Sequence, residues 1–189
     1  KSKKKFNKPL VCWVWDIPID IDSLSRNSDE SSHYTKLHRK VPKLIKMLKR
    51  CDLIITPTRS TQCDLKSLDI ESIISIPHFN TETIDNVLPH KDTTDLIQIS
   101  RFAAHKRFDV SSRAVEGSDL SFTCLGTGDS SFLNDFKNTQ VITNQTREEV
   151  IGRLKSSKIL LSPSIFEGFG LSITESIRCQ IPVIINGNN

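Results

Sequence analysis

The sequence predicts an α/β fold built on parallel β-sheet, and two observations lead to this prediction. Short apolar runs recur along the 189 residues, and most are apolar at consecutive positions. Strands that are buried on both faces of a parallel sheet have this pattern. Between the runs lie segments with helical spacing of apolar residues, and such alternation of strands and helices is typical of a doubly wound sheet.

Seven segments are expected as strands because each is short, apolar and bounded by polar residues or turn signals. They are Leu10 to Trp15, Leu53 to Thr56, Ile73 to Ile76, Leu96 to Ile99, Leu120 to Leu125, Ile159 to Leu161 and Val183 to Ile185. Five helices are expected between them: Thr35 to Arg50, Thr61 to Leu68, Lys106 to Val115, Thr146 to Ser156 and Leu171 to Cys179. Trp15 and Asp16 lie at the end of the first expected strand, where a packed strand with a turn is favoured over a ligand-binding cleft.

A polar stretch divides this series of strands and helices into two parts. It runs from Pro77 to Thr94, carries a proline near each end and has weak periodicity, as a linker does. We therefore predict a linker over residues 79–94, with one Rossmann-like unit over 1–78 and a second over 95–189.

Composition excludes several classes of protein. Apolar residues make up 37% and charged residues 25%, as in ordinary globular proteins, and no apolar run approaches the roughly 20 residues of a membrane-spanning helix. The start lacks the apolar stretch of a signal peptide, so we expect a cytoplasmic protein. The net charge of +4 is mild, and part of it comes from four lysines among the first five residues. No aromatic residues interleave them, so a solvated tail is favoured over a nucleic-acid arm, with peripheral contact to anionic lipid as the alternative.

The cysteines and histidines indicate no metal site. The five cysteines are far apart, with no Cys-x-x-Cys pair, and the five histidines do not cluster with metal-ligand spacing. We expect reduced thiols that serve as small packing residues.

One loop has the features of an anion-binding site. The expected strand Ile159 to Leu161 runs into a loop containing Gly168 and Gly170, and a helix opens directly after it. Backbone N–H groups at such a helix start suit a phosphate, and Glu167 and Glu175 offer acceptors for hydroxyl groups. From spacing alone, an ordinary turn with two solvated glutamates fits equally well.

This segment, Glu167-Gly-Phe-Gly170 with a second glutamate at Glu175, resembles the signature of the retaining GT-B glycosyltransferases, especially the large family-four group (glycosyl transferases group 1). Four further pieces follow the order of that family. They are the strand end and basic loop from Arg101 to Lys106, the glycine pair Gly126 and Gly128, the helix Glu148 to Leu154, and the proline-led strand Ile181 to Ile184. The resemblance covers about Cys51 to the end.

The resemblance implies a GT-B fold in which 1–78 ends the N-terminal, acceptor-side domain and 95–189 belongs to an incomplete C-terminal domain that binds a nucleotide sugar. It implies transfer of a hexose from a nucleotide diphosphate sugar to a glycan, lipid or protein-linked acceptor, with retention of configuration and without metal or cofactor. We expect a fragment of a longer enzyme. The alternative is a binding module without turnover, or a truncated, inactive homologue.

The resemblance also assigns roles to residues. Arg101 and Lys106 pair with the diphosphate, Glu175 accepts hydrogen bonds from the ribose, and Glu167 does so from the transferred sugar. The complete expected donor site is Arg101, Lys106, Gly126, Glu167, Gly168, Phe169, Gly170, Leu171 and Glu175, of which Glu167, Arg101 and Lys106 are the expected catalytic residues.

Two positions depart from the family pattern. Ser100 stands where a glycine usually precedes the arginine, and Gln180 stands where a glycine usually follows the helix. If Gln180 keeps the left-handed conformation of that glycine, the strain costs about 1–2 kcal/mol.

Overall fold

The computed structural model describes residues 8–15, 40–76, 81–165 and 167–187. The chain divides into two compact units, which are described separately. The first comprises Lys1–His78 and Glu167–Phe169, and the second comprises Phe79–Phe166 and Gly170–Asn189. Both contain parallel sheet with helices, which confirms the predicted α/β class. The predicted domain limits and linker remain predictions.

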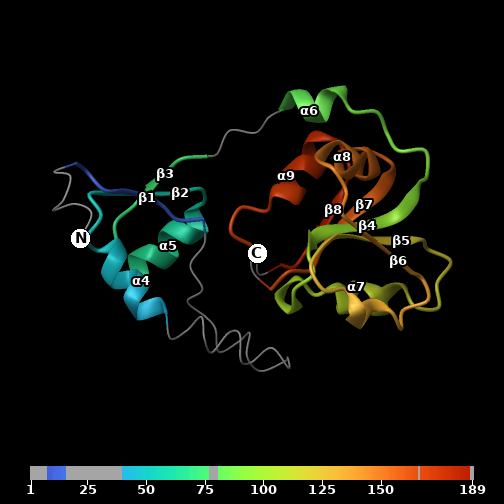
Figure 1. Cartoon of the computed structure of the whole chain (residues 1–189), viewed down its shortest axis with the longest axis horizontal. Helices are drawn as coiled ribbons and strands as arrows, with labels where there is room; N and C mark the ends of the chain where they lie inside the picture. Colours follow the sequence, from blue (N-terminus) through green and yellow to red (C-terminus); the bar gives the residue numbers. More distant parts are fainter. Residues whose placement is uncertain (1–7, 16–39, 77–80, 166, 188–189) are drawn as a thin grey trace. The chain divides into compact units, whose positions relative to one another are not determined.

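The first unit is a three-stranded parallel sheet in the order β1-β2-β3. Its strands are β1 (Val11–Trp13), β2 (Leu53–Thr56) and β3 (Ile73–Ile74), and its helices are α4 (Val41–Leu48) and α5 (Arg59–Ser67). Each connection steps one strand further in the same direction. Because such crossovers are right-handed, α4 and α5 lie on the same face of the sheet (Figure 1).

The core of the first unit lies between that face and its two helices. Buried Val14 and Ile54 pack with Leu48 of α4 and Leu65 of α5. Trp15 follows β1 and stacks on Trp13, with 6.0 Å between the ring centroids. The predictions for residues 35–39, for Asp16 and for the N-terminal lysines lie outside the described residues.

The second unit is a five-stranded parallel sheet in the order β6-β5-β4-β7-β8. The strands are β4 (Thr94–Arg101), β5 (Phe122–Thr127), β6 (Thr139–Thr143), β7 (Ser157–Ser162) and β8 (Val183–Ile185). From β4 the chain first builds the sheet outward through β5 and β6, then returns to add β7 and β8 on the other side. Ligands of open α/β sheets bind at the carboxyl ends of the strands, where the strand order reverses in this way.

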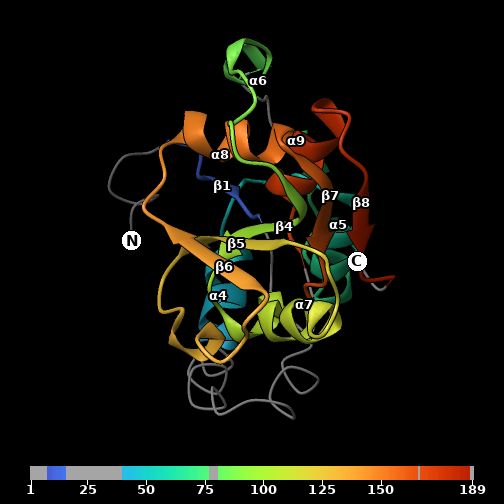
Figure 2. The same ribbon diagram turned by 90° about the vertical axis from the view of Figure 1, so that its right-hand side faces the viewer.

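Helices cover both faces of this sheet. α7 (Phe108–Val115) lies on one face, and α8 (Arg147–Lys155) and α9 (Leu171–Arg178) lie side by side on the other (Figures 1 and 2). Leu96 of β4 packs in a cluster with Phe108, whereas the next residue, Ile97, packs in a second cluster with Leu154. Neighbouring apolar residues thus point to opposite faces, which explains the consecutive apolar pattern of the sequence.

One strand and one α-helix of the second unit were not predicted. β6 is an edge strand whose residues are all partly buried or exposed, so it has no buried apolar run. α6 (Thr81–Asn86) is a six-residue polar helix inside the predicted linker. The segment after it is tied to α8, since the His90 N–H donates to the Gly152 carbonyl at 2.9 Å and Lys155 Nζ donates to the Val87 carbonyl at 2.6 Å.

At the end of α9, Gln180 has φ 60° and so keeps the left-handed conformation in which a glycine is usual. The N–H of Gln180 donates to the Ile177 carbonyl and the N–H of Ile181 to the Ser176 carbonyl. These two bonds form a Schellman motif, in which the left-handed position normally belongs to glycine.

The five cysteines are free. Cys124 lies in β5 and is fully buried, and this burial raises the pKa of its thiol to about 12. Cys63 in α5 is exposed. Within the described residues, no helix is long and apolar enough to cross a membrane.

Candidate functional site

Three of the predicted site segments meet at the carboxyl edge of the five-stranded sheet. Arg101 is the last residue of β4, Gly126 lies near the end of β5, and Ser162 ends β7 just before the glutamate and glycine loop. Because β5, β4 and β7 are parallel neighbours, these ends share one edge. β4 and β7 also flank the reversal of strand order, which is where α/β sheets bind ligands.

Lys106 lies in a tight turn above the end of β4. The 3₁₀ turn η1 (Ala104–Lys106) closes on Arg107, which has φ 55°. α7 starts only at Phe108, so the helix predicted from Lys106 begins two residues later. The lysine residue is 9% exposed, whereas Arg101 is exposed to solvent. The two predicted phosphate ligands therefore lie in different environments.

A buried glutamine holds this turn. Gln98, in the middle of β4, is 2% exposed, and its Nε2 donates to the Lys106 carbonyl at 2.7 Å. Its Oε1 accepts a hydrogen bond from Ser111 Oγ of α7, also at 2.7 Å. Both ends of the buried amide are thus satisfied, and the bonds fix the turn and the first part of α7 to the sheet. The prediction missed Gln98, although a lone polar residue inside the run Leu96 to Ile99 could have signalled it.

A backbone hydrogen bond connects the Lys106 turn to the loop that follows β7. The N–H of Ile165 donates to the carbonyl of His105 at 2.8 Å. On the other side of this loop, Asn186 Nδ2 donates to the Ser164 carbonyl at 3.3 Å. The structure therefore brings together two segments that are about 60 positions apart in the sequence.

Gly126 has a packing role at this edge. A Cβ atom built on it would lie 1.9 Å from the Ser100 carbonyl oxygen and 3.3 Å from the ring of Phe102. Backbone cannot move aside as a flexible side chain can, so a side chain at position 126 would separate β4 from β5. A role of Gly126 in donor binding stays a prediction.

The helix α9 starts as the sequence predicts, directly after Gly170. Gly170 is its N-cap residue with φ 69°, and Leu171, the first helical residue, is 50% exposed. Glu175 lies one turn into the helix and is buried, with 4% of its surface exposed. Its Oε1 accepts from Arg147 Nη2 at 2.6 Å, forming an ion pair. Arg147 was not predicted, because the two residues are 28 positions apart and no local pattern links them.

The remaining predicted residues belong to the first unit. Glu167, Gly168 and Phe169 group there, whereas Gly170, Leu171 and Glu175 group with the second unit. The second unit thus contains Arg101, Lys106, Gly126, Gly170, Leu171 and Glu175. The place of the other three residues in the site remains a prediction.

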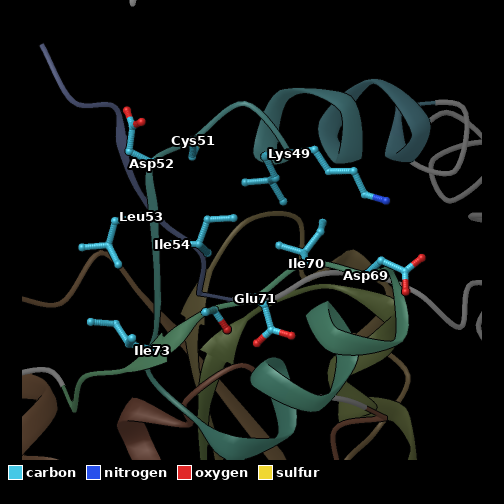
Figure 3. Close-up of a pocket in the computed structure, with 11 residues that line it drawn as sticks. Lys49, Cys51, Asp52, Leu53, Ile54, Asp69, Ile70, Glu71 and Ile73 are labelled. Carbon is cyan, nitrogen blue, oxygen red and sulfur yellow. The ribbon is translucent and has the colours of Figure 1, made fainter.

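Two surface cavities lie among the described residues. One of about 590 Å³ is in the first unit, lined among others by Lys49, Asp52, Leu53, Glu71 and Ile73 (Figure 3). β2 and β3 begin at Leu53 and Ile73, so this cavity is at the amino ends of the strands. The other, of about 420 Å³, lies at the starts of β4, β5 and β6. Neither contains a predicted donor-site residue. Across the described ranges, no three His, Cys, Asp or Glu side chains are grouped to hold a metal ion.

Comparisons with known proteins show which family the sequence matches and which solved structures have a similar fold. The family described as glycosyl transferases group 1 matches residues 80–188, more than half of the chain. No curated protein matches the chain in sequence. Among solved structures, sucrose-phosphate synthase from Thermosynechococcus elongatus is similar, with a TM-score of 0.75 and 13% identity over 97% of this chain and 51% of its own.

Two other solved structures are similar over more than nine-tenths of the chain. The Anabaena protein HepE, solved with UDP-glucose, has a TM-score of 0.68 and 12% identity, covering 97% of this chain and 55% of its own. WaaG, a glycosyltransferase involved in lipopolysaccharide biosynthesis, has a TM-score of 0.66 and 16% identity, covering 93% and 55%.

The chain spans about half the length of these three proteins. At such low identity the structural similarity shows the fold alone, which is the GT-B type predicted from the sequence. The match to the family covers the strand ends, the Lys106 turn and the glycine loop described above. The chain therefore belongs to the glycosyl transferases group 1 family.

Proposed function

We propose that this chain carries the donor-binding part of a glycosyltransferase that transfers a hexose from a nucleotide diphosphate sugar. The observation that carries the proposal is the hydrogen bond from the Ile165 N–H to the His105 carbonyl. This bond joins the Lys106 turn to the loop before α9. This bond places a cation-bearing turn beside the loop that leads to a helix start, at the reversal of strand order. A diphosphate fits such a site.

Arg101 and Lys106 stabilise the diphosphate in this proposal. When the bond between the sugar C1 atom and the diphosphate oxygen breaks, the diphosphate gains negative charge. Cations that are already held in place stabilise this charge with little reorganisation. The buried Gln98 bonds hold the backbone of Lys106, so the position of this residue is fixed before the donor arrives.

The carboxylates recognise the hydroxyl groups of the donor. Glu175, buried near the start of α9, accepts hydrogen bonds from the ribose, and Glu167 accepts them from the transferred hexose. HepE has been solved with UDP-glucose, and TarM from S. aureus with UDP. Uridine nucleotides are therefore the first ligands to test on this chain.

The proposal includes retention of configuration and an acceptor that is a glycan, a lipid-linked sugar or a protein. The family resemblance supports both. In this family the acceptor attacks the face from which the diphosphate leaves, so the proposal needs no covalent intermediate on a carboxylate. Contact with a membrane surface belongs to the proposal only for a lipid-linked acceptor.

Calorimetric titration of the 189-residue chain with uridine and UDP tests the proposal. A charged hydrogen bond to a shielded phosphate contributes about 1.5–3 kcal/mol, so Lys106→Ala should weaken UDP binding by roughly tenfold to a hundredfold. Uridine binding should hardly change. Arg101→Ala should have a smaller effect, because Arg101 is exposed and solvent screens its charge.

Lys158→Ala is the matched control. Lys158 pairs with Asp95 at 2.6 Å near the amino ends of β7 and β4, so its loss should leave UDP binding unchanged. If Lys106→Ala binds UDP as tightly as the unmodified chain, the phosphate site has been misplaced. If no nucleoside diphosphate binds the unmodified chain, the donor-binding function is wrong.

A further inference from the structure

The proposed ribose ligand is a buried carboxylate that has a cationic partner. The Glu175 side chain is 5% exposed, and its Oε1 accepts from Arg147 Nη2 at 2.6 Å. The Arg147 side chain is 46% exposed, so it reaches from the surface to the buried acid. Burying a carboxylate is costly unless a cation or several hydrogen-bond donors compensate for its lost hydration.

The start of α8 determines the position of Arg147. It is the first residue of α8, and a capping box holds that helix start, with the Glu149 N–H donating to Thr146 Oγ1 and the Thr146 N–H donating to Glu149 Oε2. α8 follows β6 and α9 follows β7, so both helices begin at the carboxyl edge of the sheet. They pack side by side (Figure 2). The ion pair therefore joins the first residue of α8 to a residue one turn into α9, near the edge where the donor is proposed to bind.

We propose that Arg147 is a positioning residue that orients Glu175 for the ribose and makes the site prefer ribonucleotides over deoxyribonucleotides. This inference rests on the proposed function. Arg147 occupies Oε1 of Glu175, and a carboxylate has a second oxygen with lone pairs of its own. With one oxygen held by the guanidinium, the carboxylate cannot rotate freely, and Oε2 presents a fixed acceptor to the vicinal hydroxyl groups of a ribose.

Loss of Arg147 has a specific consequence for this arrangement. Without its guanidinium partner, the buried carboxylate is no longer held in one orientation and turns toward water. It then stops acting as an oriented acceptor, and the ligand loses the contribution of its hydroxyl groups. A merely structural role would differ, because general loosening of α8 or α9 would weaken ribonucleotides and deoxyribonucleotides alike.

The experiment compares UDP, ADP and GDP with their 2′-deoxy forms by calorimetry on the 189-residue chain. The unmodified chain should bind the ribonucleotide about tenfold more tightly than the deoxy form, the effect of one hydrogen bond to a charged acceptor. Arg147→Ala should weaken the ribonucleotide toward the affinity of its deoxy form and leave the deoxy form unchanged. Arg147→Lys, which keeps the charge but not the planar guanidinium, should retain an intermediate preference.

Arg178→Ala is the matched control, because Arg178 lies on the same helix as Glu175 and forms an ion pair of equal length, 2.6 Å, with Asp85. That pair is exposed, at 52% and 48%, and is not proposed to touch ligand. Arg178→Ala should keep the preference for ribose. Thermal unfolding of each variant shows whether it is folded, and if Arg147→Ala does not fold, the preference measured for Arg147→Lys decides.

The outcomes separate this inference from the proposed function. If Lys106→Ala weakens nucleotide binding but the Arg147 variants keep the full preference for ribose, the inference is wrong and the proposed function stands. Equal weakening of both nucleotide forms by Arg147→Ala also contradicts it, since that result indicates general loosening. If the unmodified chain binds none of the six nucleotides, both proposals are overturned.

Discussion

Buried polar side chains mark the candidate site in the second unit. Gln98 and Glu175 are 2% and 4% exposed, and both have hydrogen-bond partners at short distance. Burying such groups is costly unless their partners are in place, so each fixes a neighbouring segment. The resemblance to a family identified Glu175 but not Gln98 or Arg147. Arg147 is 28 positions from Glu175, and a single sequence does not reveal such a pair. Gln98 differs, because its partners Lys106 and Ser111 are close in the sequence and its place inside an apolar run is itself a signal.

The two glutamates should have separable effects on ligand affinity. Glu175→Ala should weaken UDP and UDP-glucose alike, by about tenfold, because its proposed partner is the ribose that both ligands contain. Glu167→Ala should weaken mainly UDP-glucose, since its proposed partner is the transferred sugar. Calorimetric titration of both variants with both ligands checks this, and Glu148→Ala, in the first turn of α8, serves as a control. Equal loss of UDP affinity in the two glutamate variants would contradict the division of roles.

At the scale of the elements, the end of α9 tolerates a glutamine, Gln180, at a position where glycine is usual. Gln180 takes the left-handed conformation with φ 60° because the two hydrogen bonds of the Schellman motif and the following strand fix the backbone there. Ile181 packs against the cluster of Ile97, Leu154 and Leu160. This apolar contact, just after the turn, offsets part of the strain.

Replacing Gln180 with glycine should therefore stabilise the second unit. Glycine removes a strain of about 1–2 kcal/mol, and its greater freedom in the unfolded chain offsets about 0.4–1 kcal/mol of that gain. We expect a net increase of roughly 0.5–1 kcal/mol in the free energy of unfolding, measured by urea denaturation. Gln180→Ala is the control, because alanine keeps the strain. An equal gain in both variants would show that backbone conformation is not the cause.

The sequence predicted most of the elements, for reasons that the structure makes clear. The bounds of β2 and β8 are as predicted, and Thr146 and Ser156, the predicted limits of the fourth helix, are the caps of α8. β2 and β8 are apolar at consecutive positions, although Ile184 and Ile185 of β8 are exposed, and α8 has a capping signal of its own. β6 and α6 lack such signals, because β6 mixes threonine and glutamine with two apolar residues and the six-residue α6 depends on tertiary contacts.

For the whole molecule, the sequence predicted the GT-B class from a motif, and the family match and strand order bear it out. The strand order itself could not be derived from the sequence. It depends on pairings such as Ser100 with Gly126 and Leu160 with Val183, between strands that are far apart along the chain. The grouping of Glu167–Phe169 with the first unit depends in the same way on contacts that no local pattern records.

A property of the whole chain follows from the proposed use of cations in place of a metal. Thermal unfolding with a nucleotide diphosphate sugar at 100 times its dissociation constant should show a stabilisation of about 2.7 kcal/mol. Because Arg101 and Lys106 are proposed to hold the diphosphate, the same shift should persist in EDTA and should not grow when Mg²⁺ is added. Loss of the shift on chelation would mean that a metal ion bridges the donor and the protein, and the assignment of the two cations would have to be abandoned.

The rate at which the buried thiol of Cys124 is chemically labelled can report local opening of the sheet around β5. In β5 this thiol is fully buried and has a pKa of about 12, so a thiol reagent near neutral pH can modify it only when the sheet opens. The exposed Cys63 of the first unit reacts without any opening and supplies the intrinsic chemical rate. The ratio of the two labelling rates, read by mass spectrometry, then gives the free energy of local opening around β5 without denaturant or an introduced probe.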